Sequence, residues 1–154
     1  MTAAYVISPA LIGGLVKEAG QEWVTVHLHG RLGVITIPRS LVLTKEELLP
    51  GHEVQFFFSY LEVDDVPRDY DLSELGMLRE VTPVPVGGVL TEVNDTAVKC
   101  EMPGGMGVVA VPRRWVFTNQ ALAVGQTAGF YFSPMRLVGK RDIPAAFHLI
   151  LSSH

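Results

Sequence analysis

Apolar and polar residues alternate along much of this chain, a pattern that predicts half-buried β-strands. From Trp23 to His29, the apolar residues Val24, Val26 and Leu28 occupy every second position. Comparable runs predict further strands at Leu15–Ala19, Leu32–Ile37, Val54–Val63, Val89–Val93, Ala97–Met102, Met106–Val111 and Ala128–Ser133. Turn signals such as Gly20-Gln21, Asn94-Asp95 and Pro103-Gly104-Gly105 separate several of these runs. The chain is therefore expected to be built mainly from short strands.

The same pattern occurs twice. When the sequence is shifted by 74 positions, residues 13–59 align with residues 87–133 without a gap, and 16 of the 47 aligned pairs are identical. The identical pairs include Gly33/Gly107, Pro38/Pro112 and Arg39/Arg113. A period this long exceeds that of solenoids and propellers, so the repeat indicates two copies of one small domain.

We predict an all-β protein formed by tandem duplication of a small β-barrel of about four to five strands, with a short helical connector. The first barrel repeat is assigned to residues 1–65, the connector to 66–83 and the second repeat to 84–154. Leu72–Leu78 in the connector fits about two helical turns, and Thr44–Glu47 fits a capping box opening one helical turn. A unit of about 60 residues is marginally stable alone, so the copies are expected to pack together or to dimerise.

Composition narrows the class of protein. Of the 154 residues, 48% are hydrophobic and the net charge is only -4, which excludes a disordered chain. No apolar run approaches the roughly 20 residues of a membrane-spanning helix, and the first residues lack the pattern of a secretory signal. The single cysteine, Cys100, cannot form an internal disulfide, so a cytoplasmic location is expected.

Each repeat carries a Gly-x-x-Gly element, an apolar strand and a Pro-Arg pair. Gly30, Gly33 and their matches suit turns or bulges with positive φ. Arg39 and Arg113 allow two interpretations. They either pair with the matched residues Glu18 and Glu92, or contact a ligand or partner.

The two halves differ in charge. Residues 1–74 hold 11 acids and 5 bases, whereas residues 75–154 hold 5 acids and 7 bases. Arg113, Arg114, Arg136, Lys140 and Arg141 supply much of the basic excess. Opposite net charges favour contact between the halves or with a second subunit, and binding of nucleic acid is the other possibility.

Three resemblances follow from these motifs. Gly14, Val24, Val26, Gly33, Pro38, Ser40, Leu48, Gly51 and Val54 resemble the pattern of small RNA-binding barrels of the oligonucleotide-binding class, named after a ribosomal protein. That resemblance implies base stacking on aromatics, and Trp23 lies near such a position. Gly30-Arg31, Ile37-Pro38 and Leu48–Val54 resemble the swapped-hairpin DNA-binding fold of transition-state regulators and antitoxins. Gly30–Gly33 with Pro38-Arg39 is also similar to uncharacterised small proteins of anaerobic, clostridial-type bacteria, which imply no known activity.

Evidence for an enzyme or a metal site is weak in this sequence. His27 and His29 lie on one face of a predicted strand, but a metal would need further ligands such as His52. Cys100 matches Val26 and is expected to be a small core residue. Phe57 and Tyr131 are expected to face outward and to form a patch at an interface. Phosphate-binding, dinucleotide and nucleophile-elbow motifs are absent from the sequence, and neither a cofactor nor a metal is expected.

These features favour a non-catalytic interaction protein. Association with a protein partner or with further copies of the chain is the first hypothesis, and membrane binding is not expected. The alternative is binding of single-stranded nucleic acid, RNA in particular. The residues expected to contact a ligand or partner are Trp23, Arg39, Arg113 and Arg114.

Overall fold

The computed structural model describes residues 7–66 and 72–140. The strands of the first repeat are β1 (Ala10–Ala19), β2 (Trp23–Leu28), β3 (Val34–Pro38), β4 (His52–Phe58) and β5 (Leu61–Asp64). Those of the second are β6 (Val84–Val93), β7 (Ala97–Met102), β8 (Gly107–Pro112), β9 (Val116–Phe117), β10 (Thr127–Phe132) and β11 (Arg136–Lys140). Short 3-10 turns occur at η1 (His29–Arg31), η2 (Arg39–Leu41) and η3 (Arg113–Trp115), and the helix α1 (Ser73–Met77) lies between the repeats. The all-β class and the short connector helix are confirmed.

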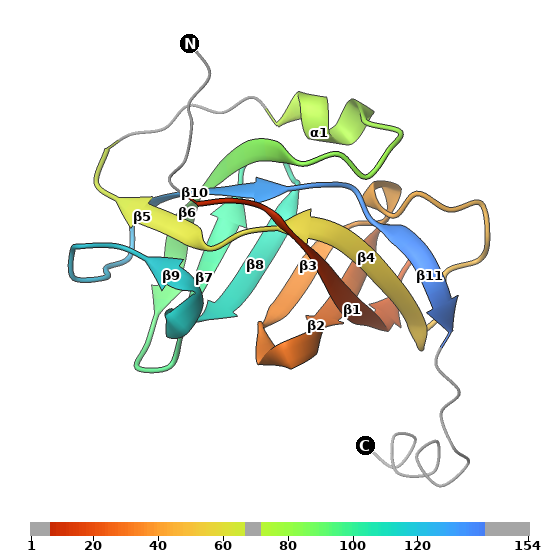
Figure 1. The fold of residues 1–154 in the computed structure, drawn as a ribbon, viewed down its shortest axis with the longest axis horizontal. Coiled ribbons are helices and arrows are strands. Elements are labelled where there is room, and N and C mark those ends of the chain that lie inside the picture. Colours follow the sequence, from red (N-terminus) through yellow and green to blue (C-terminus); the bar gives the residue numbers. More distant parts are fainter. Residues whose placement is uncertain (1–6, 67–71, 141–154) are drawn as a thin grey trace, which may run out of the picture.

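Both repeats contribute to one sheet that closes on itself. The strand order is β11-β4-β1-β2-β3-β8-β7-β6-β10-β5-β9, and an additional pairing of β4 with β10 completes a ring. Four strands from each repeat form this ring, with β1–β3 on one side and β6–β8 on the other (Figure 1). Each repeat was expected to form a barrel of its own. The structure differs because β3 pairs with β8 and β4 pairs with β10, so each repeat supplies half of the ring.

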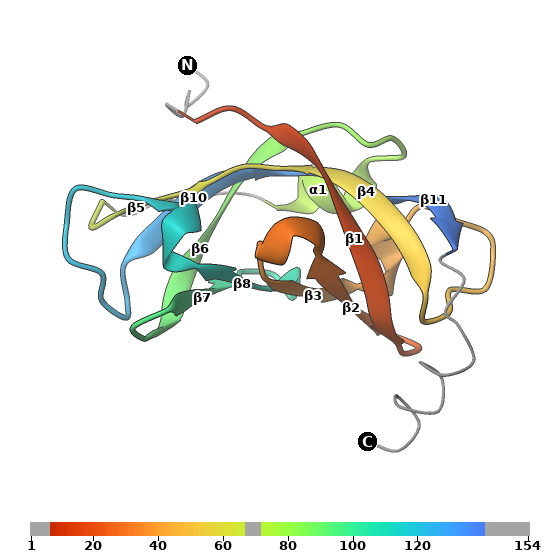
Figure 2. The same ribbon diagram turned by 60° about the horizontal axis from the view of Figure 1, so that its bottom comes forward.

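Matching residues of the two repeats meet at both seams between the halves. At the first seam Ile35 pairs with Val109, and at the second Phe58 pairs with Phe132. The members of each pair are 74 positions apart in sequence, as are the bounds of β1 and β6 and those of β2 and β7. A twofold pseudosymmetry axis therefore passes through both seams. In Figure 2, β4 and β10 lie in the upper part of the ring, β2, β3, β7 and β8 lie below them, and β1 crosses in front of β4.

The last strand of each repeat crosses to the other half of the ring. β5 of the first repeat pairs with β10 of the second, and β11 of the second pairs with β4 of the first. The single strand predicted at Val54–Val63 is therefore wrong. β4 ends at Phe58 and β5 begins at Leu61, because the chain leaves its own half of the ring at Ser59-Tyr60.

Two buried serines form hydrogen bonds between the repeats at the points where the chain crosses to the other half of the ring. The Ser133 hydroxyl accepts the Phe57 N–H at 2.8 Å, and the Ser59 hydroxyl accepts the Tyr131 N–H at 2.8 Å. Ser59 and Ser133 match each other in the repeat, and each binds backbone of the other repeat. The hydroxyls also donate to the carbonyl oxygens of Tyr60 and Pro134, so the four bonds form two equivalent pairs.

The ring encloses a single hydrophobic core shared by both repeats. Phe56, Phe58, Phe130 and Phe132 are fully buried, and the rings of Phe56 and Phe132 meet edge to face with centroids 5.3 Å apart. Alternation along β4 and β10 turns Phe57 and Tyr131 away from this core, as predicted. Both side chains are nevertheless half-buried, so the expected exposed patch is not present at these two residues.

Glycine allows the close approach of strands at the first seam. Gly33 has φ 118° and Gly107 has φ 110°. A β-carbon at Gly33 would overlap the carbonyl oxygen of Ala110, and one at Gly107 would overlap that of Thr36. Positive φ at Gly30 and Gly104 also agrees with the sequence-based expectation.

The two helical predictions had different outcomes. α1 lies within the predicted range, and its Leu75 is buried. Thr44–Glu47, by contrast, does not form a helical turn. The Thr44 hydroxyl accepts the N–H of Glu46, only two residues later, which stabilises a bend in place of a capping box.

Candidate functional site

The arginines of the two Pro-Arg pairs each form a hydrogen bond to the turn of a β-hairpin. The Arg39 side chain donates to the Gly20 carbonyl oxygen at 2.9 Å, and the Arg113 side chain donates to the matching Asn94 carbonyl oxygen at 2.6 Å. These carbonyls belong to the turns that follow β1 and β6. The arginines therefore bind backbone oxygens, whereas pairing with Glu18 and Glu92 was one of the two interpretations. Glu92 instead forms an ion pair with Lys99 at 3.4 Å.

Arg114 connects the two repeats. Its guanidinium donates to the carbonyl oxygens of Gly30 at 3.1 Å and Arg31 at 2.8 Å. Both acceptors lie in η1, where Arg31 has a positive φ of 57°. Arg114 thus has a structural role at the seam between the halves, in addition to its exposed charge.

Trp23 pairs with Pro38, the residue before Arg39, but no arginine lines the surface beside its side chain among the residues described. Its side chain is 44% exposed and borders a shallow depression of about 250 Å³ that also includes Glu101 and Met102. No described arginine lines this depression. The structure therefore does not bring Trp23, Arg39, Arg113 and Arg114 together into one site.

A different surface, not predicted from the sequence, forms an aromatic groove. We define the aromatic groove by Tyr60, Trp115 and Phe117, which line a cavity of about 440 Å³ together with Ile7, Ser8, Ala10, Phe58 and Ser59. Tyr60 is 44% and Phe117 is 52% exposed. The indole N–H of Trp115 donates to the Ser59 carbonyl oxygen at 2.8 Å. The Trp115 ring meets that of Tyr60 edge to face, with centroids 4.1 Å apart. These contacts hold the indole in place, so the groove is preformed.

Part of the pseudosymmetric counterpart of this groove is buried. Leu41, Leu43 and Pro134 match Trp115, Phe117 and Tyr60. Leu41 and Pro134 are buried, and α1 packs against η2, which contains Leu41. α1 and the residue before it insert Leu75 and Leu72 into the core. The same face of the fold is therefore capped by a helix in one half and exposes aromatic rings in the other.

The repeat itself contains the signal that would have revealed this groove. At matched positions the first repeat has the aliphatic residues Leu41 and Leu43, whereas the second has Trp115 and Phe117. Aromatic rings at positions that an aliphatic residue fills elsewhere in the same fold indicate a surface with an additional role.

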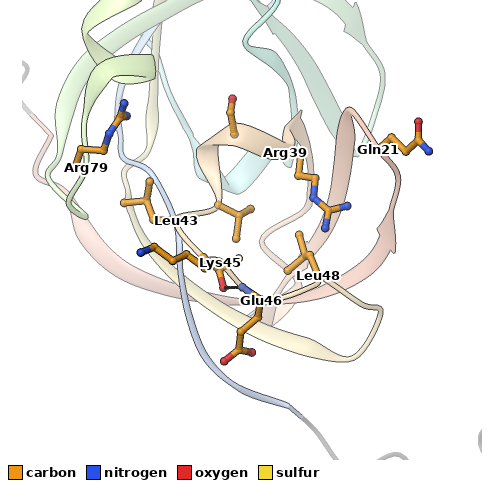
Figure 3. Close-up of a pocket in the computed structure, with 10 residues that line it drawn as sticks. Gln21, Arg39, Leu43, Lys45, Glu46, Leu48 and Arg79 are labelled. Carbon is orange, nitrogen blue, oxygen red and sulfur yellow. Dashed lines mark hydrogen bonds between the residues drawn. The ribbon is translucent and has the colours of Figure 1, made fainter.

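A second cavity is lined by cations. It has a volume of about 650 Å³ and lies between the loop that follows η2 and the segment after α1. Arg39, Lys45 and Arg79 line it together with the acid Glu46 (Figure 3). The Arg39 guanidinium thus donates to the Gly20 carbonyl oxygen and also borders this cavity.

The surroundings of His27, His52 and Cys100 are those of structural residues. Among the residues described, no three His, Cys, Asp or Glu side chains are grouped as metal ligands. His52 is buried, and its Nδ1 accepts the Leu49 N–H at 3.0 Å. Partial burial and nearby Lys17 lower the pKa of His27, although Glu18 opposes this effect. Cys100 is a core residue as predicted, and burial followed by the Glu101 charge raises its pKa to about 12.

Comparisons with known proteins add little. A scan of protein-family models gives no match, and a search of curated proteins also gives none. A crystal structure of the cytoplasmic molybdate-binding protein ModG, with molybdate bound, is similar over 86% of this chain and 96% of that chain, at 20% identity and a TM-score of 0.27. Agreement this low does not establish a shared fold or ligand. In the described residues no helix has the length and apolar character needed to cross a membrane.

Proposed function

We propose that this chain is a non-catalytic, cytoplasmic binding protein that associates with a protein partner through the aromatic groove. One comparison within the molecule supports this proposal most directly. Leu41 and Pro134 are buried, and α1 packs against η2, whereas their counterparts Trp115 and Tyr60 border the aromatic groove. An exposed aromatic surface on a rigid scaffold is typical of an interaction site.

The covered face indicates which kind of segment fits the groove. α1 belongs to a short segment in which Leu72 and Leu75, three residues apart, are both buried. Residues at this spacing share one face of a helix. We therefore propose that the partner contributes a short amphipathic helix with two apolar side chains at this spacing.

Charge near the groove favours an acidic segment. Arg113 and Arg114 directly precede Trp115, and both are exposed. Acidic residues beside the apolar pair of the partner helix would complement these guanidinium groups and increase the association rate. α1 itself has Glu74 beside Leu75.

Single-stranded nucleic acid binding, the alternative from the sequence, has less support. Arg39, Arg113 and Arg114 each donate to backbone carbonyl oxygens. Trp23, the proposed stacking residue, shares its depression with the acid Glu101. Binding of a single strand uses basic residues beside an aromatic platform, and among the described residues no arginine or lysine lines the depression at Trp23.

Selection from a displayed library of helical peptides tests the proposal. We expect the selected sequences to share two apolar residues three or four positions apart. Their binding should be lost in the double variant Tyr60→Ser, Phe117→Ser and retained in Val89→Ser, a matched control at another exposed apolar residue. Circular dichroism should show that all variants are folded.

Two results would contradict this function. The selected peptides could lack the paired apolar residues, or could bind the double variant as well as the unmodified chain. Sedimentation of the chain alone provides a further check. A dimer that the double variant abolishes would show that a second copy occupies the groove, in place of a separate partner.

A further inference from the structure

The cation-lined cavity has a charge opposite to that of its surroundings. Residues 1–74 hold 11 acids and 5 bases, yet two of those bases, Arg39 and Lys45, line this one cavity. Arg79 adds a third cation, and Glu46 is the one acid in its lining. Clefts lined by one sign of charge concentrate the field and attract ligands of the opposite sign.

These cations are not neutralised within the protein. Throughout residues 7–66 and 72–140, Arg39, Lys45 and Arg79 form no ion pair. The Glu46 carboxylate points away from the Lys45 ammonium group in Figure 3. An unpaired cluster of like charges costs electrostatic energy, which a bound anion would reduce.

The Arg39 guanidinium is held in position. Its side-chain hydrogen bond to the Gly20 carbonyl oxygen uses one of five N–H donors. The remaining donors can bind a carboxylate or phosphate group in a bidentate manner. Figure 3 places the Arg39 guanidinium on one side of the cavity and the Lys45 and Arg79 side chains on the other, with Leu43 also on their side.

The connector supplies the cation that distinguishes this cavity from the matching surface of the second repeat. Lys45 corresponds to Asn119 and Gln21 to Asp95, whereas Ser40 corresponds to Arg114 and Glu46 to Gln120, so the matched positions have the same net charge in both repeats. Arg79 lies outside the aligned repeats and adds a further positive charge to this cavity alone.

We propose that this cavity binds a small organic anion with more than one oxyanion group, either a phosphate ester or a polycarboxylate. One anionic group contacts Arg39, and another contacts Lys45 and Arg79. A cavity of about 650 Å³ is within the size range of small-molecule sites. This binding is independent of the aromatic groove, because the two sites have no lining residue in common.

Isothermal titration calorimetry of the full chain tests this site. The probes are ATP, citrate and a short single-stranded DNA, each titrated without divalent metal at about 20 mM and about 200 mM salt. We expect ATP or citrate to bind with one-to-one stoichiometry and more weakly at the higher salt. ATP binding alone would identify the ligand as a phosphate ester, and citrate binding alone would identify it as a polycarboxylate.

Variants locate the site. Lys45→Gln and Arg79→Gln should each weaken binding by about tenfold, since each removes one charge-assisted contact. Lys17→Gln removes the same charge from β1 and should change the affinity less than about twofold. Arg39 is left unchanged because it also fastens the β1–β2 hairpin.

Three outcomes would overturn the proposal. The first is that neither ATP nor citrate binds at low salt, where electrostatic attraction is strongest. The second is that Lys17→Gln weakens binding as much as Lys45→Gln, which would indicate diffuse attraction. The third is that the DNA binds while ATP and citrate do not, which would indicate a nucleic-acid surface.

Discussion

Removing the Ser133 hydroxyl should destabilise the whole ring. The side chain is fully buried, accepts the Phe57 N–H at 2.8 Å and donates to the Pro134 carbonyl oxygen at 2.8 Å. In Ser133→Ala the Phe57 N–H loses its acceptor and the Pro134 carbonyl oxygen loses its donor. Loss of a partner for a buried polar group costs about 1–3 kcal/mol, so we expect the free energy of unfolding to fall by about that amount.

The matched serine gives a second, independent measurement. Ser59 makes the equivalent bonds to Tyr131 and Tyr60, so Ser59→Ala should have a similar effect, and the double variant should approach the sum of the two. Equilibrium unfolding in urea, followed by circular dichroism and by tryptophan fluorescence, measures these changes. Ser8→Ala, at an exposed position, is the control and should be nearly neutral.

The shape of the transition is as informative as its midpoint. Because both serines connect the repeats, the two probes should report one transition with an unchanged slope in every variant. A change below about 0.5 kcal/mol in both single variants would refute the role assigned to these hydroxyls. Separate transitions for the two repeats would refute the shared ring.

Three further predictions concern the interior and the charge of the molecule. Gly107→Ala and Gly33→Ala should each lower the free energy of unfolding by more than about 2 kcal/mol in urea titrations, because φ is positive at both positions and a β-carbon would overlap the facing strand. A neutral effect of either substitution would contradict the close approach of the strands at the first seam. Because the pKa of folded His27 is below its ordinary value of 6.5, the unfolded chain binds the proton more tightly. The contribution of His27 to the free energy of unfolding should therefore be complete above pH 6.5 and decline as the pH falls. On acidification, the urea midpoint should then fall less steeply in His27→Gln than in the unmodified chain. Identical pH profiles of the two proteins would refute this. Cys100, whose pKa is raised to about 12, should react with a thiol reagent at pH 8 only as fast as the chain unfolds, and rapid labelling of the folded protein would contradict its burial.

Local strand structure was predictable because alternation depends on neighbouring residues alone. β7 has the bounds that the sequence predicted, Ala97–Met102, and β2 differs from its predicted range by one residue. The 74-residue repeat likewise appears directly in the sequence and recurs in the strand bounds. These features need no knowledge of how the two copies meet.

The assembly of the repeats could not be predicted from those patterns. Closure depends on the pairing of Phe58 with Phe132 and of Ile35 with Val109, which no local pattern specifies. A residue that faces inward in a separate barrel also faces inward in a shared ring, so burial alone does not distinguish the two. The break at Ser59-Tyr60 was missed for the same reason, because the apolar run continues through the crossing.

The candidate site was predicted less well than the fold. Arg39, Arg113 and Arg114 were selected for their charge, but hydrogen bonds to distant carbonyl oxygens depend on the folded geometry. Trp115 and Phe117 were not predicted, because similarity between the repeats indicates shared positions and not the positions at which the repeats differ. Their difference from Leu41 and Leu43 was present in the sequence. The proposed resemblances to nucleic-acid-binding barrels and to small clostridial proteins stay predictions.

Fluorescence of Trp115 tests the aromatic groove most directly. The chain has two tryptophans, so Trp23→Phe leaves Trp115 as the sole reporter. The ligand is a synthetic peptide with the sequence of residues 72–80, which contains the Leu72 and Leu75 side chains that cover the equivalent face. We predict a saturable change in emission at peptide concentrations up to about 1 mM, corresponding to about 4 kcal/mol of binding free energy. The change should disappear when both peptide leucines are replaced by aspartate. An emission spectrum that stays constant, or that changes equally with the aspartate peptide, would contradict the groove as a docking site for an apolar helix.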